Sequence, residues 1–194
     1  LIVFTSDNGG STDQNNDTKY PDDNCPKGKL TGNNLPLRGQ KGSLYEGGIR
    51  VPTIARWPGK LKHGTEFETP VCVVDWMPTF CALAKVKAEP SEPKWDGVNL
   101  WPALTGKAKL AERSLHIAGP GGNRWALRDG DWKLILTQHR NRDSPGKPKV
   151  ELFNLANDPN EEAEVAAKNP EMVAELKVTL DKQRKLDLPS RGGL

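Results

Sequence analysis

The chain has 194 residues, of which 35% are hydrophobic, and a formal net charge of +3. Its 19 glycines and 16 prolines require many turns and loops, which excludes a helical bundle. Lysines and arginines are scattered, and no apolar run approaches the roughly 20 residues that cross a bilayer, so we expect neither nucleic-acid binding nor a membrane span.

An apolar run opens the chain at residues 1–4, and Asp7, Asn8 and two glycines follow it. The branched and aromatic side chains of the run predict a buried strand. In open α/β sheets, sites form beyond the carboxyl ends of strands, which is where Asp7 and Asn8 fall. Their oxygens suit a hard divalent cation, but Asp-Asn-Gly-Gly is equally typical of an ordinary turn. Since such a strand needs neighbours on both sides, we expect this chain to be the C-terminal part of a longer protein.

Residues 11–35 are polar and predict a long surface loop. Residues 71–74 predict a short buried strand, after which Asp75 is expected to cap a helix ending near Ala84. Cys72 and Cys81 lie in these apolar segments and are interpreted as small buried hydrophobic residues, whereas Cys25 lies in the polar loop.

The pattern changes after residue 110. Residues 125–137 predict a β-hairpin around Asp129-Gly130-Asp131, with His116 in a preceding strand. Residues 150–154 predict a further antiparallel strand, and residues 161–186 a helix interrupted at Pro170. The fold class is therefore α/β, followed by a small α+β subdomain in which a helix packs on an antiparallel sheet.

Residues 37–52 form a dense segment of glycines and charged side chains. The glycines beside Lys41 allow the backbone and the ammonium to approach an anion together, and lysine suits sulfate or phosphate oxygens. Glu46 and Arg50 have the spacing to pair on a helix. The alternative is a glycine-rich loop with an internal ion pair.

Several motifs together resemble the sulfatases, of the alkaline-phosphatase-like superfamily. They are Phe4-Thr5-Ser6-Asp7-Asn8-Gly9-Gly10, Leu37-Arg38-Gly39-x-Lys41-Gly42-x-x-x-Glu46-Gly47-Gly48-x-Arg50-Val51-Pro52, Trp57-Pro58-Gly59, Val74-Asp75-Trp76-Met77-Pro78-Thr79, Asp96-Gly97-Val98-Asn99-Leu100, residues 126–135, and Glu151-Leu152-Phe153-Asn154-Leu155-x-x-Asp158-Pro159-x-Glu161. The resemblance implies that residues 1–106 end an alkaline-phosphatase-like α/β sandwich, which is the catalytic domain, and that residues 107–194 form the C-terminal subdomain.

The resemblance also implies roles for individual residues. Asp7 and Asn8 ligate a divalent cation, usually Ca²⁺, and Lys41 is both catalytic and substrate-binding through the sulfate group. Glu46 and Arg50 are scaffold residues of the same loop.

His116 is either a structural histidine or, with Asn123 or Arg124, part of the rim of the substrate pocket. The remaining histidines, His63 and His139, are expected to be solvated, and core packing is expected of three tryptophans: Trp76, Trp101 and Trp132.

Sulfatases use a formylglycine made from Cys or Ser in Cys/Ser-x-Pro-x-Arg, and this sequence has no such segment. The nucleophile and the other cation ligands are therefore expected in a missing N-terminal portion, and the chain alone is expected to be inactive. The implied substrates are sulfate esters of carbohydrates or aryl alcohols, hydrolysed in a periplasm, in a lysosome or outside the cell. The alternatives are a phosphodiesterase or phosphonate hydrolase of the same superfamily, and a non-catalytic fragment.

Overall fold

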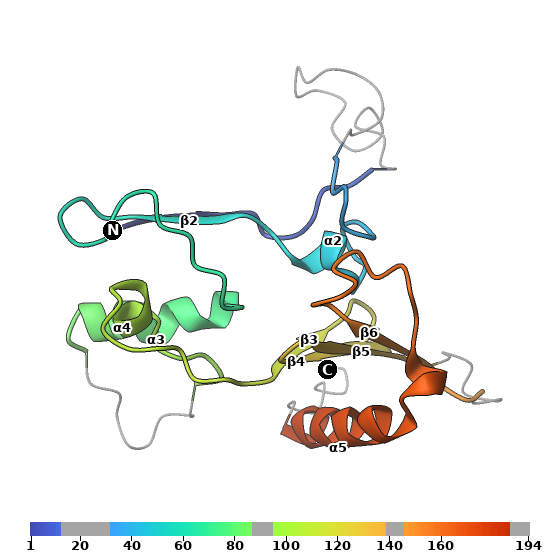
Figure 1. The fold of residues 1–194 in the computed structure, drawn as a ribbon. Coiled ribbons are helices and arrows are strands. Elements are labelled where there is room, and N and C mark those ends of the chain that lie inside the picture. The colour runs from blue at the N-terminus through green and yellow to red at the C-terminus, as the bar shows by residue number, and fades with distance from the viewer. Residues whose placement is uncertain (13–31, 87–94, 139–145, 187–194) are drawn as a thin grey trace, which may run out of the picture. The chain divides into compact units, whose positions relative to one another are not determined.

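The computed structural model describes residues 1–12, 32–86, 95–138 and 146–186 (Figure 1). The chain divides into two compact units, Leu1–Phe4 with Thr53–Glu112, and Thr5–Pro52 with Arg113–Leu194. The glycine-rich segment thus groups with the C-terminal sheet, whereas residues 1–4 group with residues 53–112.

A two-stranded sheet forms in the first unit, from β1 (Ile2–Thr5) and β2 (Thr53–Arg56). The strand is predicted correctly, but its burial is not, because Ile2 and Phe4 are 62% and 64% exposed. Branched side chains favour the extended backbone by themselves. Burial, in contrast, needs layers on both faces, and a two-stranded sheet supplies none.

The buried strand predicted at residues 71–74 is wrong. Val73–Asp75 forms a 3₁₀ helix, η1, and Val73 is 72% exposed. The fully buried Asp75 carboxylate accepts the backbone N–H of Cys72 at 2.7 Å and of Val98 at 2.9 Å, which draws the segment into a turn. Helix α3 (Trp76–Leu83) then begins directly after Asp75, as predicted.

Thr79 ties α3 to the segment before α4 (Trp101–Leu104), because its hydroxyl accepts the N–H of Leu100 at 2.8 Å. Tryptophan packing is confirmed in this unit, where the Trp76 ring stacks on Phe80 and the Trp101 ring lies 5.1 Å from that of Trp57. Cys72 and Cys81 are half-buried free thiols rather than fully buried ones. The predictions for Cys25 and His139 lie outside the described residues.

The second unit contains a four-stranded antiparallel sheet whose strands follow one another in chain order. They are β3 (Leu115–Ala118), β4 (Arg124–Asp129), β5 (Trp132–Thr137) and β6 (Lys149–Asn154). The pairing of Asp129 with Trp132 closes the predicted hairpin through a two-residue turn. The strands predicted from alternation and turn signals are therefore confirmed.

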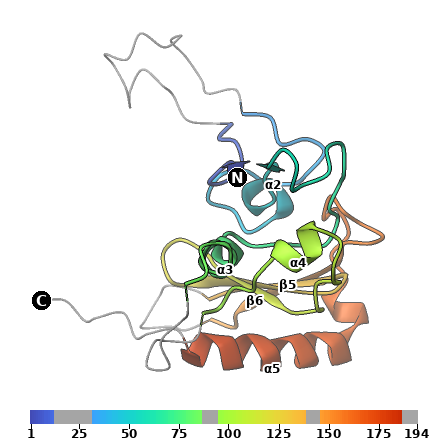
Figure 2. The same cartoon turned by 90° about the vertical axis from the view of Figure 1, so that its left-hand side faces the viewer.

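Both faces of this sheet are covered. Helix α5 (Pro170–Leu186) lies along one face in both views (Figures 1 and 2). Its buried partners in the sheet are Trp125, Leu127, Leu134, Leu136 and Leu152, with Trp132 at the margin. The opposite face carries a second cluster, formed by Leu44, Ala126, Ile135, Phe153 and Leu155. Because successive side chains of a strand alternate between faces, Lys133 falls on the face of the second cluster.

The predicted helix at residues 161–186 is interrupted as expected but begins later. Glu161 has a φ of 60°, and a 3₁₀ turn, η2 (Ala166–Lys168), precedes α5. Residues 161–165 are not helical because Glu161 is bound elsewhere, as described below. Among the described residues, no helix is long and apolar enough to cross a membrane.

Replacing Leu180 with alanine should destabilise the protein by about 2–5 kcal/mol, because this fully buried side chain fills the space between α5 and the sheet. Val178 lies on the same helix and is 56% exposed, so Val178→Ala is the matched control with little expected change. Denaturant unfolding measures both free energies. Equal effects of the two substitutions would contradict the assignment of the core.

Candidate active site

The Asp-Asn pair follows β1 as predicted. Asp7 is exposed, Asn8 is half-buried, and the amide of Asn8 donates a hydrogen bond to Oδ1 of Asp7. This contact lowers the pKa of Asp7 below its ordinary value, with the charge of Lys41 acting in the same direction. Asp7 therefore stays ionised at neutral pH and presents a carboxylate beside an amide.

A close backbone approach fixes the next residue, Gly9. Its N–H donates to the carbonyl of Gly48 at 3.0 Å, and a Cβ on Gly9 would lie 1.8 Å from the carbonyl oxygen of Gly47. No side chain fits in that space. Gly9 thus allows a direct contact between two distant backbone segments, its own and that of Gly47 and Gly48.

Asn34 and Lys41 extend this contact. The Asn34 amide accepts from the N–H of Gly10 at 2.7 Å and donates to the Gly10 carbonyl at 2.9 Å. The Lys41 N–H donates to the same carbonyl at 3.2 Å. Residues far apart in sequence thus bring the exposed Lys41 into electrostatic range of Asp7.

Asp7, Asn8 and Lys41 together offer two kinds of binding. The carboxylate and the amide oxygen are hard ligands of the kind that Ca²⁺ or Mg²⁺ takes. Calcium needs about six to eight oxygens, and the described residues contain no group of three or more Asp, Glu, His or Cys side chains that could hold a metal ion. The pair therefore fits part of a cation shell, while Lys41 offers a positive charge to an anion beside it.

A buried ion cluster contacts the end of the segment 38–46, which carries Lys41 and is called the lysine loop below. Glu46 starts the short helix α2 (Glu46–Ile49), and its Oε1 is 2.8 Å from Nζ of Lys133. The same Nζ is 2.8 Å from Oε1 of Glu161, whose Oε2 accepts the N–H of Glu46 at 2.6 Å. Burial raises the pKa of Glu161, and the ammonium of Lys133 opposes that shift. The predicted pairing of Glu46 with Arg50 is wrong, since Glu46 pairs with Lys133 and Arg50 is exposed.

Arg38 holds the other side of this loop. Its guanidinium donates to the backbone carbonyl of Glu161 at 2.8 Å and lies 4.0 Å from the centre of the Tyr45 ring. The Tyr45 hydroxyl donates to Glu151 at 2.8 Å. Burial and the Glu151 carboxylate raise the pKa of Tyr45 to about 12, so this phenol keeps its proton and is no candidate for a general base.

The remaining predicted residues have diverse environments. Arg124 donates to the carbonyl of Gly42 at 3.2 Å, which places it against the Lys41 turn. Asn123 instead donates to the Gln138 carbonyl at the sheet margin. His116 is half-buried in β3 opposite Leu127, and His63 is exposed as predicted. A role for His116 at a substrate pocket stays a prediction.

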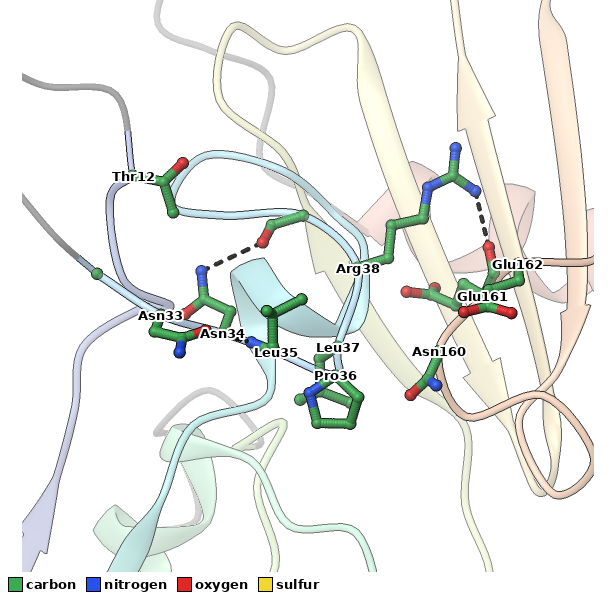
Figure 3. Close-up of a pocket in the computed structure, with 12 residues that line it drawn as sticks. Thr12, Asn33, Asn34, Leu35, Pro36, Leu37, Arg38, Asn160, Glu161 and Glu162 are labelled. Carbon is green, nitrogen blue, oxygen red and sulfur yellow. Dashed lines mark hydrogen bonds between the residues drawn. The ribbon is translucent and has the colours of Figure 1, made fainter.

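A groove of about 690 Å³ lies beside the lysine loop, between residues 32–39 and residues 160–162 (Figure 3). Most polar side chains of its lining already have partners in the protein. Asn34 binds Gly10, Asn33 accepts from the N–H of Leu35, and Arg38 reaches the backbone of Glu161. The groove thus shows how the loop is held and does not identify a ligand.

Lys133 and Glu161 have structural importance that the sequence interpretation missed. Both occur in the quoted motifs, but no role was assigned to them. A signal was present, because Lys133 occupies an inward position of an otherwise apolar strand, and a charge at such a position requires a partner. Nothing in the sequence indicated that the partners were Glu46 and Glu161.

Comparison with known proteins gives a consistent result. A family model described as Sulfatase matches residues 1–86. Human arylsulfatase A is 31% identical over 199 residues, which cover 91% of this chain and 36% of the relative. The N-acetylgalactosamine-6-O-sulfatase of Bacteroides thetaiotaomicron is 30% identical over 191 residues, covering 93% of this chain and 35% of the relative.

Among solved structures, the complex of Ps i-CgsB with k-i-k-neocarrahexaose matches with a TM-score of 0.69 and 30% identity. The match covers 94% of this chain and 36% of that one. The chain thus spans about a third of the length of these relatives. Since the matches extend over both units, the predicted fold class is confirmed.

Substituting alanine for Gly9 should lower the free energy of unfolding by about 1–3 kcal/mol, because the added methyl group forces the two backbone segments apart. Gly42→Asn is the control, since the space around Gly42 is open and asparagine tolerates its φ of 84°. Thermal or denaturant unfolding measures both. If Gly9→Ala is as well tolerated as the control, the close approach is not what holds this site.

Proposed function

We propose that this chain, which belongs to the sulfatase family, supplies part of the active site of an enzyme that hydrolyses sulfate esters. One observation carries the proposal. The backbone N–H of Lys41 binds the Gly10 carbonyl, and the charge of Lys41 lowers the pKa of Asp7, although Lys41 lies at least 33 positions after the Asp7-Asn8 pair in the chain. A cation and an anionic ester can bind side by side there.

In the proposed reaction, Asp7 and Asn8 hold a divalent cation, which we expect to be Ca²⁺. The cation supplies positive charge to the sulfate oxygens and to the nucleophile. The low pKa of Asp7 suits this role because the carboxylate binds a cation without first losing a proton. Further ligands must complete the shell, and we propose that they come from residues outside this chain.

Lys41 is the proposed catalytic and substrate-binding residue. Breaking the ester S–O bond shifts negative charge onto the leaving oxygen and the sulfate oxygens, and a positioned ammonium stabilises that charge. The exposure of Lys41 leaves it accessible to such a group. Its loop is fixed at Gly10 and on both sides, so that little reorganisation is needed when the ester binds.

The nucleophile is also proposed to lie outside this chain. The family resemblance implies a formylglycine, and the sequence contains no Cys/Ser-x-Pro-x-Arg segment that could become one. We therefore expect these residues alone to show no turnover. The activity belongs to a protein that combines them with the nucleophile and the remaining ligands.

A sulfated carbohydrate is the proposed substrate class. Support comes from the relative named N-acetylgalactosamine-6-O-sulfatase and from the matched structure that holds k-i-k-neocarrahexaose. The arylsulfatase relative makes aryl sulfates suitable test substrates. We expect the enzyme to act in a periplasm, in a lysosome or outside the cell, in keeping with the family resemblance.

Lys41→Ala in the complete protein should lower kcat/KM for a sulfate ester by about 100–1,000-fold, because a charge that stabilises the transition state is lost. Lys62→Ala removes an exposed lysine in the other unit and should leave turnover unchanged. Steady-state kinetics with an aryl sulfate and a sulfated sugar measure the effect. Near-normal turnover by Lys41→Ala would refute the role, and faster hydrolysis of phosphate esters by the unmodified protein would favour a phosphodiesterase.

Asp7→Ala should reduce the bound divalent cation well below one per protein molecule, because the charged ligand of the pair is lost. Asp181→Ala is the control, since Asp181 is an exposed carboxylate on α5 paired with Arg184. Metal analysis after dialysis measures the cation content of both variants. Retention of stoichiometric calcium by Asp7→Ala would show that the site lies elsewhere.

A further inference from the structure

The turn that carries Lys41 lies between two residues, Arg38 and Glu46, and both are held by Glu161. The Arg38 guanidinium donates to the backbone carbonyl of Glu161 at 2.8 Å. The backbone N–H of Glu46 donates to the side-chain Oε2 of the same residue at 2.6 Å. One residue, distant in sequence, therefore fastens both ends of the turn through two different groups.

Glu161 is itself tightly fixed. It is fully buried, and its Oε1 lies 2.8 Å from Nζ of Lys133, the second residue of β5. Its φ of 60° is uncommon for a residue other than glycine, and such a conformation persists only where the surroundings enforce it. The sheet therefore provides a rigid base from which Glu161 reaches the loop.

Within the turn, the backbone is closed by short-range hydrogen bonds. Ser43 N–H donates to the Gln40 carbonyl at 2.9 Å, and the Gln40 N–H donates to the Ser43 hydroxyl at 3.2 Å. The two anchors at Glu161 therefore act together with the bond from the Lys41 N–H to the Gly10 carbonyl in setting the position of Lys41 relative to Asp7.

We propose that Glu161 is a positioning residue for sulfate-ester hydrolysis, which sets the location of Lys41 by binding Arg38 and the N–H of Glu46 while contacting neither the substrate nor the cation. This inference rests on the proposed function of Lys41. It assigns to the cluster of Lys133, Glu46 and Glu161 a role in turnover in addition to its role in folding.

The test compares three variants of the complete protein. Glu161→Ala removes the acceptor for the Glu46 N–H, whereas Glu161→Gln keeps a carbonyl oxygen there. Glu164→Ala is the matched structural control, because Glu164 lies in the same segment and its carboxylate accepts backbone N–H groups of Leu152 and Ala166, away from the lysine turn. The measurements are kcat and KM for a sulfate ester, cation content, and hydrogen exchange of the peptide that covers residues 38–50.

We expect Glu161→Ala to lower kcat at least tenfold with unchanged cation content, and to accelerate exchange in residues 38–50. Glu161→Gln should recover kcat to within about threefold of the unmodified protein. Glu164→Ala should lower stability but leave kcat unchanged. The inference is overturned if Glu161→Ala and Glu164→Ala have equal kcat values, or if exchange in residues 38–50 does not increase.

Failure of the proposed function is a separate outcome. If the unmodified protein does not hydrolyse sulfate esters, or if Lys41→Ala is fully active, the proposed function fails and the inference about turnover fails with it. If Lys41→Ala is impaired while Glu161→Ala turns over normally, the proposed function stands and the positioning role alone is refuted.

Discussion

A buried ammonium, that of Lys133, is the group on which the arrangement of the second unit depends. A lysine at full burial is tolerable only when its charge is paired, and its two partners come from the start of α2 and from the turn before η2. Removing one partner of such a pair typically costs about 3–5 kcal/mol, because the other charge stays buried. The cluster therefore joins three segments that are distant in sequence, the start of α2, β5 and the turn before η2.

The consequences extend from the cluster toward the candidate active site. Glu161 binds both ends of the lysine loop. The backbone N–H of Lys41, within that loop, binds the carbonyl of Gly10. The missing side chain of Gly9 then allows the segment after β1 to lie directly against α2. At the end of this series of contacts, the charge of Lys41 helps to lower the pKa of Asp7, whose main cause is the hydrogen bond from Asn8. The candidate site residues Asp7, Asn8 and Lys41 are thus supported by contacts that are mostly buried or made through the backbone.

Much of this fold follows from local pattern. Alternation and the Asp-Gly turn predict β4 and β5, and the apolar spacing of Leu176 and Leu180 predicts the buried face of α5. The failures occur where a distant group overrides local preference. The Asp75 carboxylate binds the backbone N–H groups of Cys72 and Val98, so that residues 71–74 do not form an extended strand. The Glu46 carboxylate pairs with Lys133 and not with Arg50, the partner that helical spacing predicts. Residue types and spacing identify Asp7, Asn8 and Lys41 as candidates, but the partners that place them are set by tertiary contacts.

The most direct measurement of the central claim is a crystal structure of the complete protein with a sulfate ester and calcium bound. The account predicts sulfate oxygens within about 3 Å of Nζ of Lys41, and oxygens of Asp7 and Asn8 at about 2.3–2.6 Å from the cation. It also predicts that the same cation lies beside the sulfate. A bound ester with Lys41 directed away from it, or a cation held without Asp7 and Asn8, would contradict the account.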